Sequence, residues 1–185
     1  MAFIISGGTV ISYAEAVDVR DKDQRITEAN EIDFTNVPDA PGSLDNYIED
    51  LTTKTTGRIN AKIKASSKWR SYLSYTGTAF DINTVPDFDP DKISARQSDF
   101  TDLCAYGTLY MYVLPKVADF GNPESAEVQK IQFFEKKFNE LFDELMSDFT
   151  WYDADDSGSV TDAEKMVTYQ PTRRTRSKRT TARVS

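Results

Sequence analysis

Apolar residues recur every three or four positions along two long segments of this 185-residue chain. The first set, which includes one threonine, is Leu44, Ile48, Leu51, Thr55, Ile59 and Ile63, and the pattern can continue to Trp69, Tyr72 and Leu73. The second set is Val128, Ile131, Phe134, Phe138, Leu141, Phe142, Leu145 and Phe149. This spacing places each set on one face of an α-helix. We predict two long amphipathic helices, with a bend or a close helix contact at Gly57 in the first.

Shorter patterns predict the remaining elements. Residues 94–113 are apolar nearly all round, which indicates a central buried helix that ends near Pro115. Asn122 followed by Pro123 is a typical start signal for the helix after it. Residues 12–29 predict a short amphipathic helix, and residues 75–91 a long loop or a small hairpin. The expected fold is mainly α, a bundle of about four to five helices with a long loop and an extended C-terminal arm.

The composition excludes most familiar enzyme chemistry. The chain has no histidine and one cysteine, Cys104, so Ser-His-Asp, Cys-His and histidine-ligated metal sites are ruled out, as are disulfides within the chain and cysteine zinc clusters. We expect Cys104 to be a small core residue. A carboxylate pair for glycoside chemistry stays open, but no spacing nominates one, and we expect no enzyme. No stretch approaches the ~20 apolar residues of a membrane span, so no membrane partner is expected.

Residues 153–164 match the twelve-residue calcium loop of the EF-hand family at each diagnostic place. Gly158 supplies the sharp turn, and a hard cation such as Ca²⁺ would find oxygen donors on Asp153, Asp155, Ser157, Ser159 (by its carbonyl) and Glu164. Only a short exit helix fits before Pro171, and residues 87–98 fail as a partner hand. These features favour a structural clip over a calcium sensor. The alternative is an Asp-rich turn that resembles such a loop without binding an ion.

Residues 171–185 form a basic tail without acidic residues. Its cations are Arg173, Arg174, Arg176, Lys178, Arg179 and Arg183. Removing these six leaves 16 basic against 30 acidic residues, a net charge of −14 for residues 1–170. The tail is either a solvated segment without a fixed partner or an arm that binds nucleic-acid phosphates or the acidic body of a neighbouring copy. Since it contains no aromatic residue, only nonspecific contact with DNA is expected.

The order of these segments resembles the small helical head-to-tail connector (adaptor) proteins of tailed bacteriophages. The likeness rests on the 44–63 helix, on the Tyr-rich tract 100–112, and on residues 151–165, which look like the Asp-rich loop before a basic tail in phage neck proteins. It implies a virion protein, assembled in the host cytoplasm, that forms a homo-oligomeric ring on the portal vertex around the DNA channel and contacts portal, tail or neck proteins.

The expected organisation has three parts: a connector-like helical domain (1–150), an EF-hand-like loop with its short exit helix (151–170) and the basic tail (171–185). The calcium-like loop and the tail lie outside the usual core of the connector family, so the resemblance does not define their roles. A second hypothesis therefore stands beside the first. In it the protein is a calcium-binding regulatory or interaction protein, and the cation switches partner binding by exposing an apolar groove.

Overall fold

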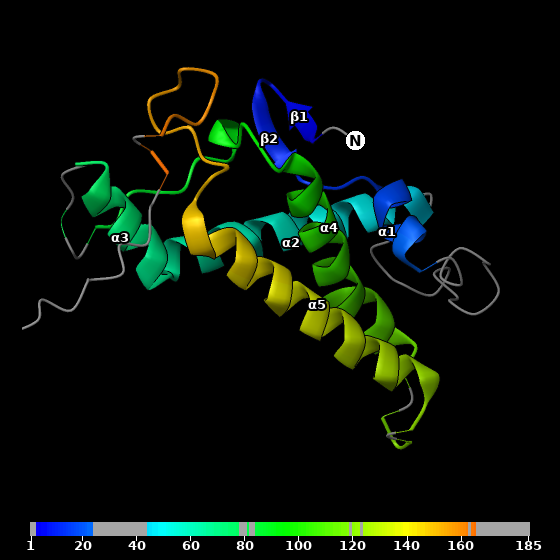
Figure 1. Cartoon of the computed structure of the whole chain (residues 1–185). Coiled ribbons are helices and arrows are strands. Elements are labelled where there is room, and N and C mark those ends of the chain that lie inside the picture. The colour runs from blue at the N-terminus through cyan, green and yellow to red at the C-terminus, as the bar shows by residue number, and fades with distance from the viewer. Residues whose placement is uncertain are drawn as a thin grey trace, which may run out of the picture.

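The computed structural model describes residues 3–23, 44–77, 81, 84–118, 120–122, 124–162 and 164–165. In this part of the chain, five α-helices accompany one two-stranded antiparallel sheet (Figure 1). The elements are β1 (Ile4–Ser6), β2 (Thr9–Ser12), α1 (Ala16–Lys22), α2 (Leu44–Ala65), α3 (Ser67–Tyr75), α4 (Gln97–Thr108) and α5 (Ala126–Asp148). The predicted mainly α fold is confirmed, while the expected C-terminal arm lies outside the described residues.

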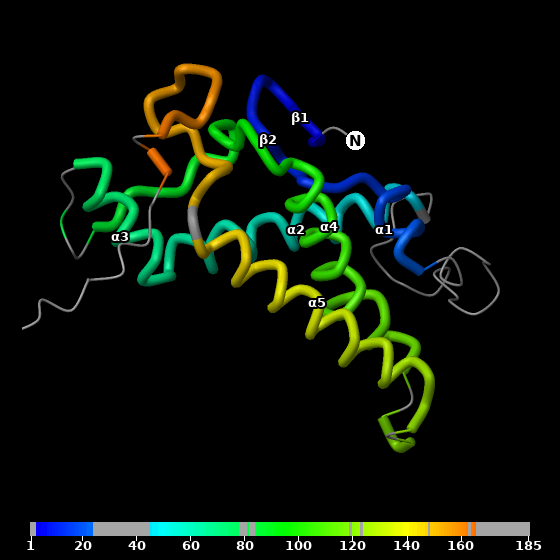
Figure 2. Tube along the Cα trace, in the orientation of Figure 1, coloured from blue at the N-terminus to red at the C-terminus, as the bar shows by residue number. Residues whose placement is uncertain are grey.

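The three longest helices build the core. The helix α4 packs against both α2 and α5, and it lies beside α5 in the trace of Figure 2. Both predicted stripes face this core: the buried members include Ile48, Leu51, Thr55, Ile59 and Ile63 on α2, and Phe134, Phe138, Phe142 and Leu145 on α5. Their burial confirms the sequence pattern and places apolar side chains between the helices.

The first long segment is two helices rather than one. The chain breaks at Ser66, whose side chain accepts a hydrogen bond from the Trp69 amide (3.1 Å) and so caps α3. The helix α2 continues through Gly57, and a Cβ built there would meet no atom within 4 Å. The expected close contact at Gly57 is therefore wrong. The close approach occurs on α4, where a Cβ at Gly107 would lie 2.7 Å from Thr55 Cγ2.

The N-terminal region also differs from the prediction. Residues 4–12 form a hairpin, and α1 begins only at Ala16. Gly7 and Gly8 make its turn with φ of +62° and +87°, values that glycine adopts without strain. The predicted helix over 12–29 is thus wrong at its start, where Ser12 belongs to β2, and its end lies outside the described residues beyond Asp23.

The predicted central helix is confirmed as α4. It continues as a π-helix (Leu109–Val113) and a 3-10 turn (Leu114–Lys116), so the helical segment ends beside Pro115 as expected. Cys104 is fully buried in it, and burial raises the pKa of its thiol to about 11, which agrees with an inert core residue. The cap of α5 is Ser125 rather than Asn122, since the Ser125 side chain accepts a bond from the Val128 amide.

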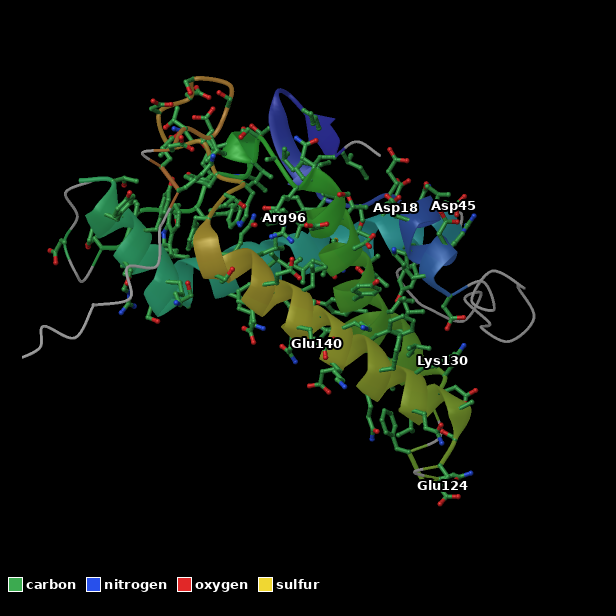
Figure 3. All side chains as sticks on the ribbon, viewed as in Figure 1. Asp18, Asp45, Arg96, Glu124, Lys130 and Glu140 are labelled. Carbon is green, nitrogen blue, oxygen red and sulfur yellow. The ribbon has the colours of Figure 1, made fainter. Side chains whose placement is uncertain are left out.

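Ion pairs tie the ends of these helices together. Arg96, before α4, bonds Glu144 near the end of α5 (2.5 Å), and Lys130 of α5 bonds Asp23 after α1 (2.6 Å). Figure 3 labels Arg96 and Lys130 at these two junctions. The Arg96–Glu144 pair is partly exposed and contributes at most about 1 kcal/mol, whereas Lys130 neutralises the buried Asp23 carboxylate.

Candidate metal centre

The predicted calcium loop follows the C-terminal end of α5. Phe149 adopts a left-handed conformation (φ +53°) that stops the helix. Trp151 follows as a fully buried anchor, and its indole Nε1 donates to the Leu145 carbonyl (2.7 Å). Tyr152 forms an antiparallel bridge with Ile93. Asp153 therefore begins the loop from a fixed position in the core.

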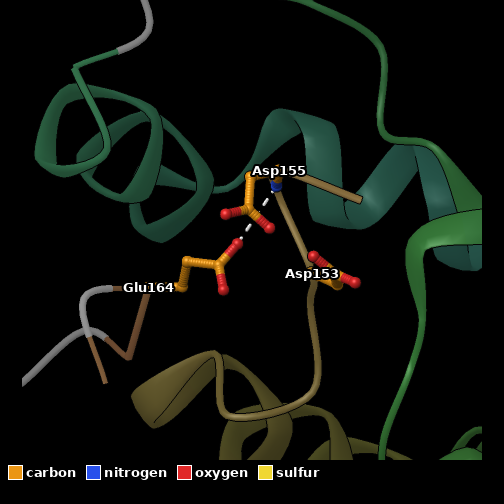
Figure 4. A group of neighbouring side chains, drawn as sticks. All are labelled: Asp153, Asp155 and Glu164. Carbon is orange, nitrogen blue, oxygen red and sulfur yellow. Dashed lines mark hydrogen bonds between the residues drawn. The ribbon is translucent and has the colours of Figure 1, made fainter. Parts of the chain in front are cut away.

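Three carboxylates of the loop converge. One oxygen from each of Asp153, Asp155 and Glu164 lies within 4.8 Å of the others, and Figure 4 shows the three side chains gathered at one place. Asp153 and Glu164 are 2% and 6% exposed, while Asp155 is open to solvent. This cluster of three negative groups could hold a metal ion, and oxygen-only donors suit a hard cation.

Backbone amides hold the carboxylates in place. Asp153 accepts bonds from the Gly158 amide (2.7 Å) and the Ser157 amide (3.1 Å), across the turn that Gly158 makes with φ +89°. Glu164 reaches back ten residues to the Ala154 amide (2.6 Å). Its second oxygen accepts from the amide and the hydroxyl of Thr161, each at 2.8 Å. The loop is thus closed by its first and last predicted ligands.

These bonds set the charge of the two buried acids. Burial alone would raise the pKa of Asp153, but the bonds from the Gly158 and Ser157 amides outweigh it and hold the pKa below its ordinary value. Burial alone would also raise the pKa of Glu164. The bonds from Thr161 and from the Asp155 and Ala154 amides outweigh burial, so the pKa of Glu164 lies below its ordinary value. Both groups therefore stay ionised at neutral pH.

The other predicted donors lie in the same loop. The Ser157 hydroxyl donates to the Ser159 carbonyl (3.1 Å), so these two oxygens lie next to each other within the loop. Lys165 is the only described residue after the loop, and its amide donates to the Thr161 carbonyl (3.3 Å); the rest of the predicted exit helix lies outside the described residues. So do the six predicted partner contacts of the basic tail, Arg173, Arg174, Arg176, Lys178, Arg179 and Arg183.

Sequence reasoning missed the segment that supports the loop. Lys92 follows Pro90 in a 3-10 turn (Pro90–Lys92), its carbonyl accepts from the Asp153 amide (2.9 Å), and its ammonium donates to the Ala154 carbonyl (2.8 Å). These partners are about 60 residues apart in the chain. No local pattern could have paired them, because periodicity and motif spacing report only on neighbours in sequence.

A cluster of aromatic side chains packs next to the loop. Its members are Trp69 and Tyr72 from α3, Phe88, and Phe149, Trp151 and Tyr152 from the chain leading into the loop. The Tyr72 hydroxyl donates to the Tyr152 carbonyl (3.3 Å). Burial, and then the nearby Glu164 carboxylate, raises the pKa of Tyr72, so this phenol stays neutral beside the acids.

Comparison of the chain with protein-family models, with curated proteins and with solved structures gives no match. Within the described ranges, no helix combines the length and the apolar character needed to cross a membrane.

Proposed function

We propose that this protein is a structural subunit of a tailed-phage neck, a head-to-tail connector that forms a ring between portal and tail around the DNA channel. The observation that carries the proposal is the closed loop at the end of the helical body. Glu164 is bonded back to the Ala154 amide, and Lys165 bonds the neighbouring Asp162 (2.7 Å). Because the Ala154 carbonyl also accepts a bond from the Lys92 ammonium (2.8 Å), the loop is attached to the body only a few residues before the basic tail begins.

The distribution of charge supports the same proposal. The first 170 residues carry a net charge of −14, and the last 15 carry six cations and no acid. An acidic body suits a channel wall that DNA passes without binding. The tail, with Arg173, Arg174, Arg176, Lys178, Arg179 and Arg183, can then contact an acidic surface of a neighbouring subunit or DNA phosphates without base specificity. In this role the protein has no turnover.

We further propose that the loop binds Ca²⁺ as a structural ion. The ligands would be Asp153, Asp155 and Glu164, with oxygens of Ser157 and Ser159 completing the shell. The three convergent carboxylates favour this, because their mutual repulsion is relieved by a divalent cation. They also favour the second candidate function, a calcium-binding interaction protein whose partner affinity depends on the ion.

Light scattering distinguishes these two functions. The mass of the purified protein would be measured with and without calcium, and with and without capsids that carry the portal. Capsids without a portal are the control. A monomer that assembles into a ring only on portal capsids supports the connector. A monomer that ignores the capsids, but binds calcium and then binds the dye ANS more strongly, supports the calcium-dependent interaction protein.

A further inference from the structure

We propose that residues 89–95, called the strap below, couple the calcium-type loop to the N-terminal hairpin, so that a change in the loop moves the hairpin. The hairpin is formed by β1 and β2, and β2 contacts the 3-10 turn Pro90–Lys92. The strap contacts both of them. The inference goes beyond the proposed function, and it does not depend on which ion or partner the loop binds.

The strap is held to the start of the loop by backbone and side-chain bonds. The Ser94 amide donates to the Trp151 carbonyl (3.0 Å), and the Asp153 amide donates to the Lys92 carbonyl (2.9 Å). The Lys92 ammonium adds its bond to the Ala154 carbonyl (2.8 Å). Because these bonds flank the isolated bridge between Ile93 and Tyr152, the strap cannot shift without moving the first residues of the loop.

The same strap holds the hairpin by its outer edge. Asp91 accepts a bond from the Val10 amide (2.7 Å) through its Oδ1 oxygen. Asp91 is itself fixed, since its amide donates to Asp89 Oδ1 (3.1 Å) and Pro90 restricts the backbone before it. Asp91 and Lys92 are adjacent in one 3-10 turn. One rigid turn therefore bonds the hairpin through one residue and the loop through the next.

Exposed apolar residues lie beyond the anchored base of the hairpin. Its base is anchored at Tyr13, whose amide donates to Thr56 Oγ1 (3.1 Å) and whose carbonyl accepts from Thr101 (2.8 Å). Its strands are only three and four residues long. Ile5 on β1 is 61% exposed and Ile11 on β2 is 40% exposed. A shift of the strap would therefore change the position of these two exposed apolar side chains.

A matched pair of glycine variants tests the coupling. Gly158 and Gly77 both have positive φ, +89° and +74°, and a Cβ at either meets no atom within 4 Å. Gly158→Val strains the loop, and Gly77→Val strains the turn after α3 by similar chemistry. Exchange of the Val10 amide would be followed by NMR. We expect it to be about tenfold faster in Gly158→Val, because local opening of the strap exposes that amide, and unchanged in Gly77→Val.

Two further variants keep the test decisive. Lys92→Met removes one bond to the loop without straining the turn, and it should also accelerate Val10 exchange. Asp91→Ala should accelerate Val10 exchange in the parent protein and abolish any further effect of Gly158→Val, while the Gly158 amide stays protected in the Asp91→Ala single variant. Unchanged Val10 exchange in both Gly158→Val and Lys92→Met would overturn the coupling. So would equal acceleration by Gly77→Val. Neither result depends on the behaviour of capsids.

Discussion

Asp153 and Glu164 are the residues on which the loop depends. Both are buried, and both accept bonds from backbone amides of the loop. Asp162 lies in the same loop but is 96% exposed and pairs with Lys165, outside the cluster of three carboxylates. The two kinds of acid should therefore behave differently when each is neutralised.

Calcium affinity should depend on Glu164 and not on Asp162. We expect Glu164→Gln to weaken calcium binding at least about tenfold, because one of the charged ligands is lost. The control Asp162→Asn should bind calcium like the parent protein. Isothermal calorimetry measures both affinities. Equal weakening by the two substitutions would mean that only the overall negative charge of the loop matters, and no heat with the parent protein would mean that the loop is an Asp-rich turn.

Acid should destabilise the protein partly through the same residues. The pKa values of folded Asp153 and Glu164 lie below the ordinary values, so the unfolded chain binds more protons and stability rises with pH. Their contribution is fully present above about pH 5, where the unfolded acids, with pKa near 4, are ionised. It is lost as pH falls through the lower folded values. Urea unfolding between pH 7 and pH 2.5, without calcium, should show a shallower loss in Glu164→Gln than in the parent protein. Parallel curves would contradict this.

The residues of the loop could be predicted because local spacing defines them. Gly158 and the acids at both ends follow a fixed pattern within twelve positions. The contacts of Lys92 with the loop and of Asp91 with the hairpin could not be predicted. The loop and the hairpin lie far from these two residues in the sequence, on opposite sides of them. Tyr72 is likewise brought beneath the loop only by the packing of α3.

At the scale of elements, the contact between α2, α4 and α5 depends on one glycine. A Cβ at Gly107 would lie 2.7 Å from Thr55 Cγ2 and 3.1 Å from Phe138 Cε2. Thr55 cannot turn away easily, because its hydroxyl is bonded to the Leu51 carbonyl and faces the Thr108 hydroxyl at 2.9 Å. The helices can therefore approach closely only while residue 107 lacks a side chain.

This contact makes Gly107→Ala and Gly57→Ala a matched pair. Alanine favours a helix over glycine by about 1 kcal/mol, so Gly57→Ala, with open space around it, should stabilise the protein by up to that amount. Gly107→Ala has the same gain in helix propensity, but its methyl group overpacks the core. We expect its free energy of unfolding to fall by about 1–2 kcal/mol. Urea denaturation gives both values. A stabilised Gly107→Ala would show that the helices move apart at little cost.

The helices could be predicted from sequence better than their boundaries. The apolar stripes on α2 and α5 are periodic over many turns, so the pattern is still recognisable where single positions are not apolar. The break at Ser66 is set by bonds of this one residue to the Trp69 amide and the Ile63 carbonyl, and the periodic pattern continues across it. The hairpin did have a local signal, Gly7 and Gly8 between short apolar runs, which is typical of a tight two-residue turn. The predicted helix began at Ser12, and no element was predicted for residues 4–11.

At the scale of the whole molecule, the basic tail should decide how the protein binds its neighbours. Deleting residues 171–185 should abolish binding to portal capsids, or weaken it at least about tenfold, because six cations are removed from an otherwise acidic chain. Replacing the same six residues by glutamine is the control for length. Binding of the full chain should weaken as salt rises from about 50 to 200 mM. Co-sedimentation with the capsids measures each case, and undiminished binding of both variants would exclude the tail as the contact.

Electron microscopy of portal-bearing capsids incubated with the full chain tests the connector function most directly. If the protein is a connector, one vertex of each capsid gains a ring of density coaxial with the portal, and capsids without a portal gain none. Density that is absent from the portal vertex, or spread evenly over all vertices, would contradict the connector function.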